Sequence, residues 1–396
     1  MDLKSAIKKL DTQNVYGSVL ALPDQCLHAW EEANKVEIPE DYKNVENIVM
    51  CGMGGSGLGA RVIESLYFSK LSKPLTRVND YHLPPYVTEK SLVFVSSYSG
   101  NTEETVQNLN EALEKKAKII VVGAGGKLID IARENGLPFY QIVPTYNPSN
   151  QPRMAIGYSI VGQLVLASKA GLLDIKKEEI ESAVNTMKKL IDENDINEAT
   201  RSDDHGIFSH LLRREQNPSE AENSSYSTSS SRSRFSAKVD KNEDNDTLKY
   251  ANSIKGKVIL YVSSEHLVGA THVVNNQQNE NAKNLSFDFS IPELNHHLME
   301  GLKHPGVNNE NILVFFFESG LYSERVQKRY LITEEVVEKN DIKNLIYKAK
   351  SDDKLSQVFE IIQFGAFFNF YLTMLYGINP APIPWVDYFK EKLDKG

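Results

Sequence analysis

Residues 47–59, NIVMCGMGGSGLG, decide the fold of the first half of the chain. A short apolar strand, Asn47–Cys51, runs into a glycine loop, and a helix from about Leu58 to Ser69 follows. Two more apolar strands, Ser91–Val95 and Lys118–Val122, are each followed by a helix in the same way. Strands without polar alternation, each followed by a helix, indicate a parallel sheet covered on both faces. We therefore expect a doubly wound α/β fold.

The same pattern returns in the second half of the chain. Lys257–Val262, KVILYV, and Ile312–Phe317, ILVFFF, have the character of central strands in a second sheet. The chain has 396 residues. Because single cores stop growing at about 250–300 residues, this length predicts two domains. We place the first domain at residues 1–153 and the second at residues 154–396, with a C-terminal helix.

Residues 198–247 differ in character from the rest of the second domain. A serine-rich run from Ser224 through Ser236 contains Arg232 and Arg234, and its flanks are charged. Such a segment buries too little apolar surface to offset the entropy of ordering it. We therefore predict a flexible insertion at this place.

The overall composition excludes several classes of protein. The formal net charge is −9 at pH 7, whereas a general nucleic-acid binder needs clustered Lys and Arg, so we expect no nucleic-acid partner. Two cysteines, Cys26 and Cys51, are too few for a disulfide framework, and we expect a cytoplasmic protein. The apolar stretch Leu355–Ile378 is long enough to span a bilayer, but Glu360 and Gln363 interrupt it. This favours a buried helix and no membrane partner.

The glycine loop has more than one interpretation. Gly52, Gly54 and Gly57 match the dinucleotide-binding pattern G-x-G-x-x-G, and Asp80 lies about where a ribose-binding acid is expected. On this interpretation the chain is an NAD-dependent oxidoreductase. The same glycines let the backbone approach any anion at a helix N-terminus, and they also serve ordinary strand–helix packing. The loop alone does not decide between these alternatives.

A second loop favours a phosphate ligand. Residues 97–105, SYSGNTEET, also follow a strand and open a helix. Three hydroxyls, those of Ser97, Ser99 and Thr102, gather there. Hydroxyl and backbone N–H donors suit the oxygens of a phosphate monoester, and a dinucleotide site does not need this loop. Helix capping explains Thr102 by itself but not the whole group.

Together the two loops resemble the sugar isomerase (SIS) domain, and more narrowly the bifunctional phosphoglucose/phosphomannose isomerase family. The resemblance covers most of the chain outside the serine-rich segment. It implies two SIS domains, each a doubly wound αβα sandwich, and reversible aldose–ketose isomerisation of glucose 6-phosphate and fructose 6-phosphate without cofactor or metal. The residues that would hold the substrate phosphate are Gly55, Ser56, Ser97, Ser99 and Thr102.

The resemblance also assigns a base and an electrostatic stabiliser. Isomerisation needs a base that moves a proton between C2 and C1, and a cation that stabilises the enediolate. The stretch Asn279-Glu280-Asn281-Ala282-Lys283 resembles the family motif whose glutamate is the base, here Glu280. Gln151-Pro152-Arg153 resembles the site of the stabilising arginine, here Arg153. Without the resemblance, Glu280 is more simply a solvated glutamate on a helix and Arg153 a surface charge.

Ring opening would fall to two further residues. The segment Pro292–His296, PELNH, resembles the family segment whose histidine shuttles protons to open the ring, and Lys390 matches the lysine that assists. In relatives this histidine reaches the site from the partner subunit, which implies a homodimer. The pair His296 and His297 has no acidic or cysteine ligand at a recognisable spacing, so we expect no metal site.

Two departures from the family pattern leave alternatives open. The family commonly has a threonine, linked to mannose 6-phosphate, where this chain has Ala381, so activity on mannose 6-phosphate is an open question. Relatives also carry Arg-Trp-Lys before the glutamate motif, where this chain has Val273-Val274-Asn275. The alternative function is a non-catalytic SIS protein that binds a sugar phosphate as a regulator. The glutamate, histidine and lysine motifs argue against it, because a sensor needs only the phosphate loops.

Overall fold

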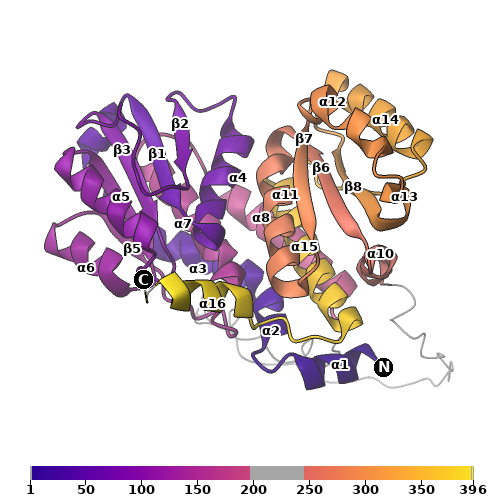
Figure 1. The fold of residues 1–396 in the computed structure, drawn as a ribbon. Coiled ribbons are helices and arrows are strands. Elements are labelled where there is room, and N and C mark those ends of the chain that lie inside the picture. The colour runs from indigo at the N-terminus through magenta and orange to yellow at the C-terminus, as the bar shows by residue number, and fades with distance from the viewer. Residues whose placement is uncertain (1, 197–244, 394, 396) are drawn as a thin grey trace, which may run out of the picture.

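The computed structural model describes residues 2–196, 245–393 and 395. Figure 1 shows two halves, each built around its own parallel sheet, with helices packed between the sheets. Most of the predicted insertion, residues 198–244, lies outside the described residues. Its predicted end at residue 247 is wrong, because Asn245 caps a helix that begins at Asp246, and Thr247 is buried in that helix.

The first sheet has five parallel strands in the order β2-β1-β3-β4-β5. Their bounds are β1 Asn47–Gly52, β2 Leu75–Val78, β3 Ser91–Ser96, β4 Lys118–Gly123 and β5 Phe139–Gln141. Because β1 lies between β2 and β3, the strand order reverses there, and in open α/β sheets ligands bind outside the carboxyl ends of the strands at such a point. The register pairs Gly52 with Ser96, so the glycine loop and the serine loop begin side by side.

The helices of the first half cover both faces of this sheet (Figure 1). The N-terminal segment forms α1 Leu3–Leu10, α2 Val15–Leu20, α3 Leu22–Asn34 and the 3-10 turn η1 Glu40–Asn44. The turn η2 Gly54–Gly57 and the helices α4 Leu58–Tyr67, α5 Glu103–Glu114 and α6 Gly126–Glu134 follow strands of the sheet. The turn η3 Pro152–Met154 leads into α7 Ile156–Lys169 and α8 Lys177–Asn194. Helix α7 packs against α3 and α4, whereas α8 contacts α3 and the long helix α15 Lys354–Tyr376.

The second sheet has four parallel strands in the order β7-β6-β8-β9. Their bounds are β6 Val258–Ser264, β7 Ser286–Ile291, β8 Ile312–Ser319 and β9 Lys343–Ala349. The helices are α10 Asp246–Ile254, α11 Val268–Gln277, α12 Leu294–His297, α13 Asn308–Asn311, α14 Glu324–Lys339, α15 Lys354–Tyr376 and α16 Pro384–Leu393. Short turns complete the half: η5 Glu265–Leu267, the π-turn η6 Gln278–Ala282 and η7 Met299–Lys303. The prediction of an α/β fold with two parallel sheets is confirmed.

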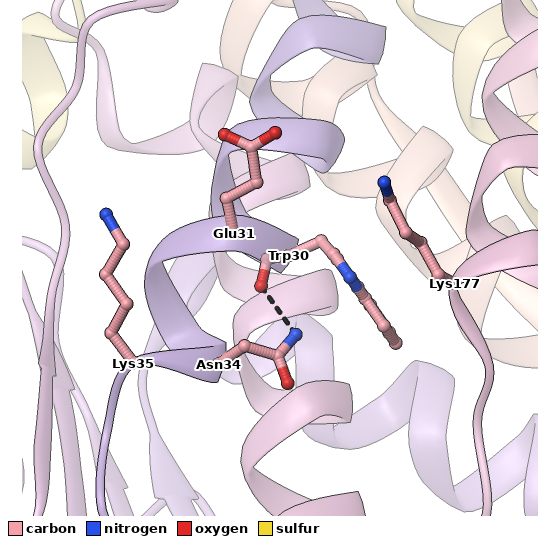
Figure 2. A pocket seen from close by; sticks show the side chains of 5 residues that line it. All are labelled: Trp30, Glu31, Asn34, Lys35 and Lys177. Atoms are coloured by element: carbon pink, nitrogen blue, oxygen red, sulfur yellow. Dashed lines mark hydrogen bonds between the residues drawn. The ribbon is translucent and has the colours of Figure 1, made fainter. Parts of the chain in front are cut away.

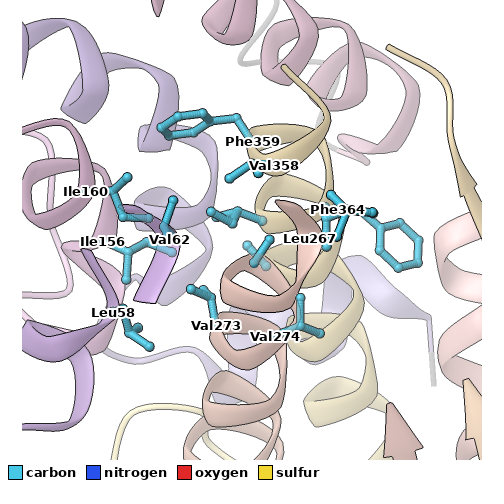
Figure 3. Close-up of a cluster of buried hydrophobic side chains, with 14 of the residues drawn as sticks. Leu58, Val62, Ile156, Ile160, Leu267, Val273, Val274, Val358, Phe359 and Phe364 are labelled. Carbon is cyan, nitrogen blue, oxygen red and sulfur yellow. The ribbon is translucent and has the colours of Figure 1, made fainter. Parts of the chain in front are cut away.

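The two halves share one apolar core. Figure 3 shows side chains from α4 and α7 meeting side chains from η5, α11 and α15. Leu58 and Val62 face this contact from the first half, and Leu267 and Val273 face it from the second, each at most 1% exposed. A fully buried aliphatic side chain contributes about 1.5–3 kcal/mol to folding, so this contact holds the halves firmly together. At Gly269 a Cβ atom would lie 2.6 Å from the Cα of Val62, so a glycine is required where α11 crosses α4.

Helix α15 is the apolar stretch that is long enough to cross a membrane. In the structure 94% of an apolar stretch of 18 residues in this helix is buried. The helix contacts α8, α10 and α11. The carboxylate of Glu360 is bound inside the protein by the hydroxyl of Tyr347 at 3.0 Å and by the main-chain N–H of Ser351 at 2.9 Å. The stretch is therefore a core helix of this fold. The division of the chain at residue 153 stays a prediction.

Candidate active site

The glycine loop forms one side of the candidate site. After β1 the chain turns through η2, with Gly54 at a φ of +48°. A Cβ at Gly57 would lie 2.7 Å from the carbonyl oxygen of Gly52, so this tight turn requires glycine there. The Ser56 hydroxyl accepts a hydrogen bond from the main-chain N–H of Tyr98 at 2.9 Å. This bond ties the glycine loop to the serine loop.

The serine loop collects three hydroxyls in front of α5. The Ser97 Oγ lies 2.9 Å from the Thr102 Oγ1 and 3.5 Å from the Ser99 Oγ, and Ser97 is only 1% exposed. The turn requires Gly100, which has a φ of +70° and whose Cβ would overlap the carbonyl oxygen of Gly125. The predicted phosphate-binding hydroxyls are thus brought together at the carboxyl end of β3. Such a cluster offers several donors to one anion.

Arg153 lies next to the glycine loop and is almost completely buried. A Cβ built on Gly55 would lie 3.4 Å from the Cα of Arg153, so η3 packs directly against η2. Arg153 is 3% exposed, and burial lowers the pKa of its guanidinium. The charges of Glu280 and Asp387 oppose this shift. Arg153 is therefore a buried cation beside the proposed phosphate site, not a surface charge.

Four hydrogen bonds fix the Arg153 guanidinium. Its Nε donates to the Asn281 Oδ1 at 2.6 Å, and its Nη1 donates to the Gln151 Oε1 at 2.9 Å. Its Nη2 donates to the main-chain oxygens of Pro380 at 3.0 Å and Ala381 at 2.6 Å. A guanidinium has five N–H donors. Within the described part of the chain, these bonds leave one N–H of Nη1 for a further acceptor.

Glu280 lies in the π-turn η6, which continues α11. Its Oε2 is 3.9 Å from the Arg153 Nε, and its side chain is 32% exposed. Burial raises the pKa of the Glu280 carboxyl, although three neighbouring cations act against this shift. In order of strength these cations are Arg153, Lys283 and Lys390. A carboxylate with a raised pKa beside a fixed cation is an arrangement typical of a general base.

Of the two predicted ring-opening residues, Lys390 lies near Glu280 and His296 does not. Lys390 lies on α16, is exposed, and is near enough to Glu280 to act on the pKa of that carboxyl. His296 lies on α12, also exposed, at the other end of β7 from η6. Six strand residues at about 3.3 Å each put roughly 20 Å between the two ends, and Figure 1 shows α12 and α16 far apart. One chain therefore brings Arg153 and Glu280 together but leaves His296 away from them.

Sequence reasoning missed several groups that hold the site. Asn281 and Gln151 bind Arg153, and Lys283 bridges to the loop before α16. All three belong to the motifs that resemble those of the family, Gln151–Arg153 and Asn279–Lys283, and this membership was the only sign of their roles in the sequence. Most of the groups that they bind lie in distant parts of the chain. Among the residues that the structure describes, no cluster of three or more His, Cys, Asp or Glu side chains is placed to hold a metal ion.

A separate hollow among the described residues does not include these groups. It has a volume of about 600 Å³ and is lined by Trp30, Glu31, Asn34, Lys35 and Lys177 (Figure 2). Its residues come from the end of α3 and the start of α8, away from the two loops and Glu280. The hollow therefore contains none of the predicted site residues.

The fold and these loops define an SIS protein. Residues 41–166 match the SIS domain, and residues 243–393 match the bacterial phospho-glucose isomerase C-terminal SIS domain. Among solved structures, a hypothetical protein from Thermus thermophilus superposes with a TM-score of 0.66 at 16% identity, covering 99% of this chain and 93% of that one. A putative tagatose-6-phosphate ketose/aldose isomerase from Clostridium novyi NT gives a TM-score of 0.61 at 13% identity, covering 96% and 94%.

Curated relatives narrow the class to one family. The chain is 30% identical over 392 residues to the bifunctional phosphoglucose/phosphomannose isomerase of Caldicellulosiruptor bescii, covering 96% of this chain and 98% of that protein. It is 26% identical to the enzyme of the same name from Aquifex aeolicus, covering 92% and 94%. The chain belongs to the bifunctional phosphoglucose/phosphomannose isomerase family.

Proposed function

We propose that this protein is a sugar-phosphate isomerase that interconverts glucose 6-phosphate and fructose 6-phosphate through an enediolate, without a metal or cofactor. The observation that carries the proposal is the pair of Arg153 and Glu280, 3.9 Å apart, beside two loops suited to a phosphate. Relatives named bifunctional phosphoglucose/phosphomannose isomerase, which align over nearly the whole chain, support it. A non-catalytic sensor needs the loops but not the pair of Arg153 and Glu280.

The geometry supports a division of labour between these groups. Gly55, the Ser56 and Ser97 hydroxyls and their loop neighbours bind the phosphate and leave C1 and C2 of the open sugar for the pair. Glu280 takes the proton from one carbon and returns it to the other. Its raised pKa favours such exchange, because a base works best when its pKa approaches the working pH. Arg153 offers its remaining N–H to the enediolate oxygen, in an environment that strengthens the interaction.

We propose that the working unit is a homodimer in which His296 of the partner subunit completes each site and opens the ring together with Lys390. Two features support the dimer. His296 is exposed and distant from Glu280 within one chain, and α16 exposes the large apolar side chains Trp385 and Phe389 at 83% and 63%. We place the protein in the cytoplasm, where its buried free thiols stay reduced.

A mixing experiment tests the shared site. E280Q and H296A subunits should each be inactive alone, but a mixed dimer has one site with both groups intact. Unfolding and refolding an equimolar mixture should restore about a quarter of the wild-type activity, because half of the randomly paired symmetric dimers are mixed and each has one good site. An inactive mixture that elutes as a dimer would reject a shared site, and so would a monomeric active wild type.

Activity on mannose 6-phosphate is a separate question. Ala381 holds Arg153 through its main-chain oxygen, and its own side chain is 2% exposed. The arginine therefore does not need a threonine at this position. We propose that glucose 6-phosphate and fructose 6-phosphate are substrates with Ala381 in place, and that A381T raises the activity on mannose 6-phosphate relative to fructose 6-phosphate. An unchanged ratio in this variant would contradict the second statement.

The primary experiment is a coupled assay of EDTA-treated protein with fructose 6-phosphate and, separately, mannose 6-phosphate. We expect turnover of fructose 6-phosphate, and loss of turnover in E280Q with nearly unchanged sugar-phosphate binding. E178Q, which changes an exposed glutamate of α8, is the matched control and should keep full activity. Binding without turnover in the wild type would reject the isomerase and favour the sensor.

A further inference from the structure

Lys283 occupies an unusual place directly after the π-turn that carries Glu280. Its backbone is left-handed, with φ 51° and ψ 33°. Its ammonium group donates to three main-chain oxygens: Asn281 at 3.1 Å, Asn379 at 3.2 Å and Pro380 at 2.8 Å. An ammonium has three donors and no acceptor. All of its hydrogen-bonding capacity is therefore used on the backbone.

Lys283 and Arg153 bind the same short loop, residues 379–381. The Pro380 oxygen accepts from Lys283 at 2.8 Å and from the Arg153 Nη2 at 3.0 Å. Two cations held this close repel each other. Burial and the charge of Arg153 lower the pKa of Lys283 to about 8, against the opposing charge of Glu280. The carbonyl oxygens of the loop offset this repulsion, so the loop and the two cations stabilise one another.

The same loop is the attachment of helix α16. None of the ten residues of α16, all of which the structure describes, is buried. The loop before it is held by Lys283, by Arg153 and by the Asn379 Nδ2, which donates to the Thr12 hydroxyl at 3.0 Å. Helix α16 carries Lys390, which acts on the pKa of Glu280. The position of Lys390 therefore depends on the loop, since packing of α16 itself does not fix it.

We propose that Lys283 is a positioning residue of the isomerase: it binds loop 379–381 and thereby sets the place of both the Arg153 guanidinium and helix α16. The proposal rests on the proposed function, because it names a further residue of that same site. A simple helix cap is the competing explanation, since lysines near helix C-termini bind the last carbonyl groups. A cap accounts for the bond to Asn281 but not for the bonds to Asn379 and Pro380.

The kinetic test compares three variants. K283M should lower kcat by about tenfold to a hundredfold, because small displacements of groups that act on the transition state have effects of this size. Its KM should stay within about twofold, since Lys283 does not contact the phosphate loops. K283R keeps the charge and should recover part of the loss. K255M is the matched control. Lys255 also donates to a main-chain oxygen near the end of α15, that of Leu375 at 2.7 Å, but it lies outside the site.

A second readout follows α16 directly and does not require activity. The chain has two tryptophans, so in a W30F background the fluorescence anisotropy of Trp385 reports the mobility of α16. K283M should lower this anisotropy, and K255M should leave it unchanged. If K283M does not fold, K283Q replaces it in both experiments.

Wild-type kcat together with wild-type anisotropy in K283M would overturn the proposal. An equal loss of kcat in K255M would also overturn it, because the effect would then be one of general stability. If the wild type has no isomerase activity, the proposed function fails. The anisotropy then still decides whether Lys283 holds α16.

Discussion

Replacing Arg153 with lysine is the most informative perturbation of the site. The guanidinium makes four hydrogen bonds from a side chain that is 3% exposed. A lysine keeps the charge but has only three donors, on a single nitrogen. At least one of the four acceptors in R153K therefore loses its bond to residue 153, and of these four the Pro380 oxygen still accepts from Lys283.

Two magnitudes follow from this geometry. An unsatisfied buried acceptor costs about 1–3 kcal/mol, so the free energy of unfolding of R153K should fall by that amount. Removing one oriented donor from a developing oxyanion typically lowers kcat by about 10²–10³-fold. Because Arg153 lies beside the phosphate loops without binding the phosphate in our scheme, KM for fructose 6-phosphate should change far less than kcat.

The assay is the coupled isomerase reaction with purified R153K, alongside urea unfolding of the same sample. R133K is the matched control, since Arg133 is on the surface with 57% of its side chain exposed and pairs with Asp130 at 3.5 Å. Exposed pairs contribute about 0–1 kcal/mol, so R133K should match the wild type in both measurements. A kcat for R153K within twofold of the wild type would refute the role of Arg153 as the enediolate stabiliser.

Three further results are expected. On the acidic side, the rate should fall at a higher pH than the pKa of an ordinary carboxyl would give, because the pKa of Glu280 is raised. On the alkaline side, the rate should fall near pH 8, because Lys283, with a pKa of about 8, loses its proton there. In K283R the alkaline limb should move upward, and a pH profile of kcat checks both limbs. Burial and Glu318 raise the pKa of Glu334 to about 7, so the folded state binds that proton more tightly than the unfolded chain, and this stabilisation is present below pH 4.5 and lost as the pH rises through 7. The difference in free energy of unfolding between E334Q and the wild type, taken from melting curves, should therefore be more favourable to E334Q at pH 8.5 than at pH 5 by roughly 1 kcal/mol, after allowance for screening by solvent. The same difference at both pH values would contradict this prediction. S97A should raise KM by about tenfold or more with a smaller effect on kcat, since a hydrogen bond to a charged group is worth about 1.5–3 kcal/mol, and a purely kcat effect would remove Ser97 from the phosphate site.

The sheets and the two loops were predictable because their signals are local. The apolar strand Asn47–Cys51 is followed directly by its glycines, and the hydroxyls at 97–102 form a second short run of neighbouring residues. The parallel strand order then brings both loops to one edge of the sheet. The apolar character of the strands and the residues of the turns after them were enough for that step.

The rest of the site depends on contacts between distant segments. Arg153 was predicted as a candidate, but its ligands at Pro380 and Ala381 lie more than 200 residues away in the chain. Lys283 belonged to a quoted motif yet had no assigned role, because its partners at Asn379 and Pro380 are distant. At Ala381 the sequence drew attention to a missing hydroxyl, whereas the structure uses the main-chain oxygen. The predicted role of His296 still awaits the mixing experiment.

The most direct test of proton transfer by Glu280 is the fate of hydrogen during the reaction in D₂O. After many turnovers with fructose 6-phosphate, proton NMR should show deuterium at C2 of glucose 6-phosphate and at C1 of fructose 6-phosphate in the wild type. E280Q should introduce none over the same period. Product that forms without any deuterium would indicate a hydride shift, and exchange by E280Q at the wild-type rate would assign the base to another residue; either result would contradict the account.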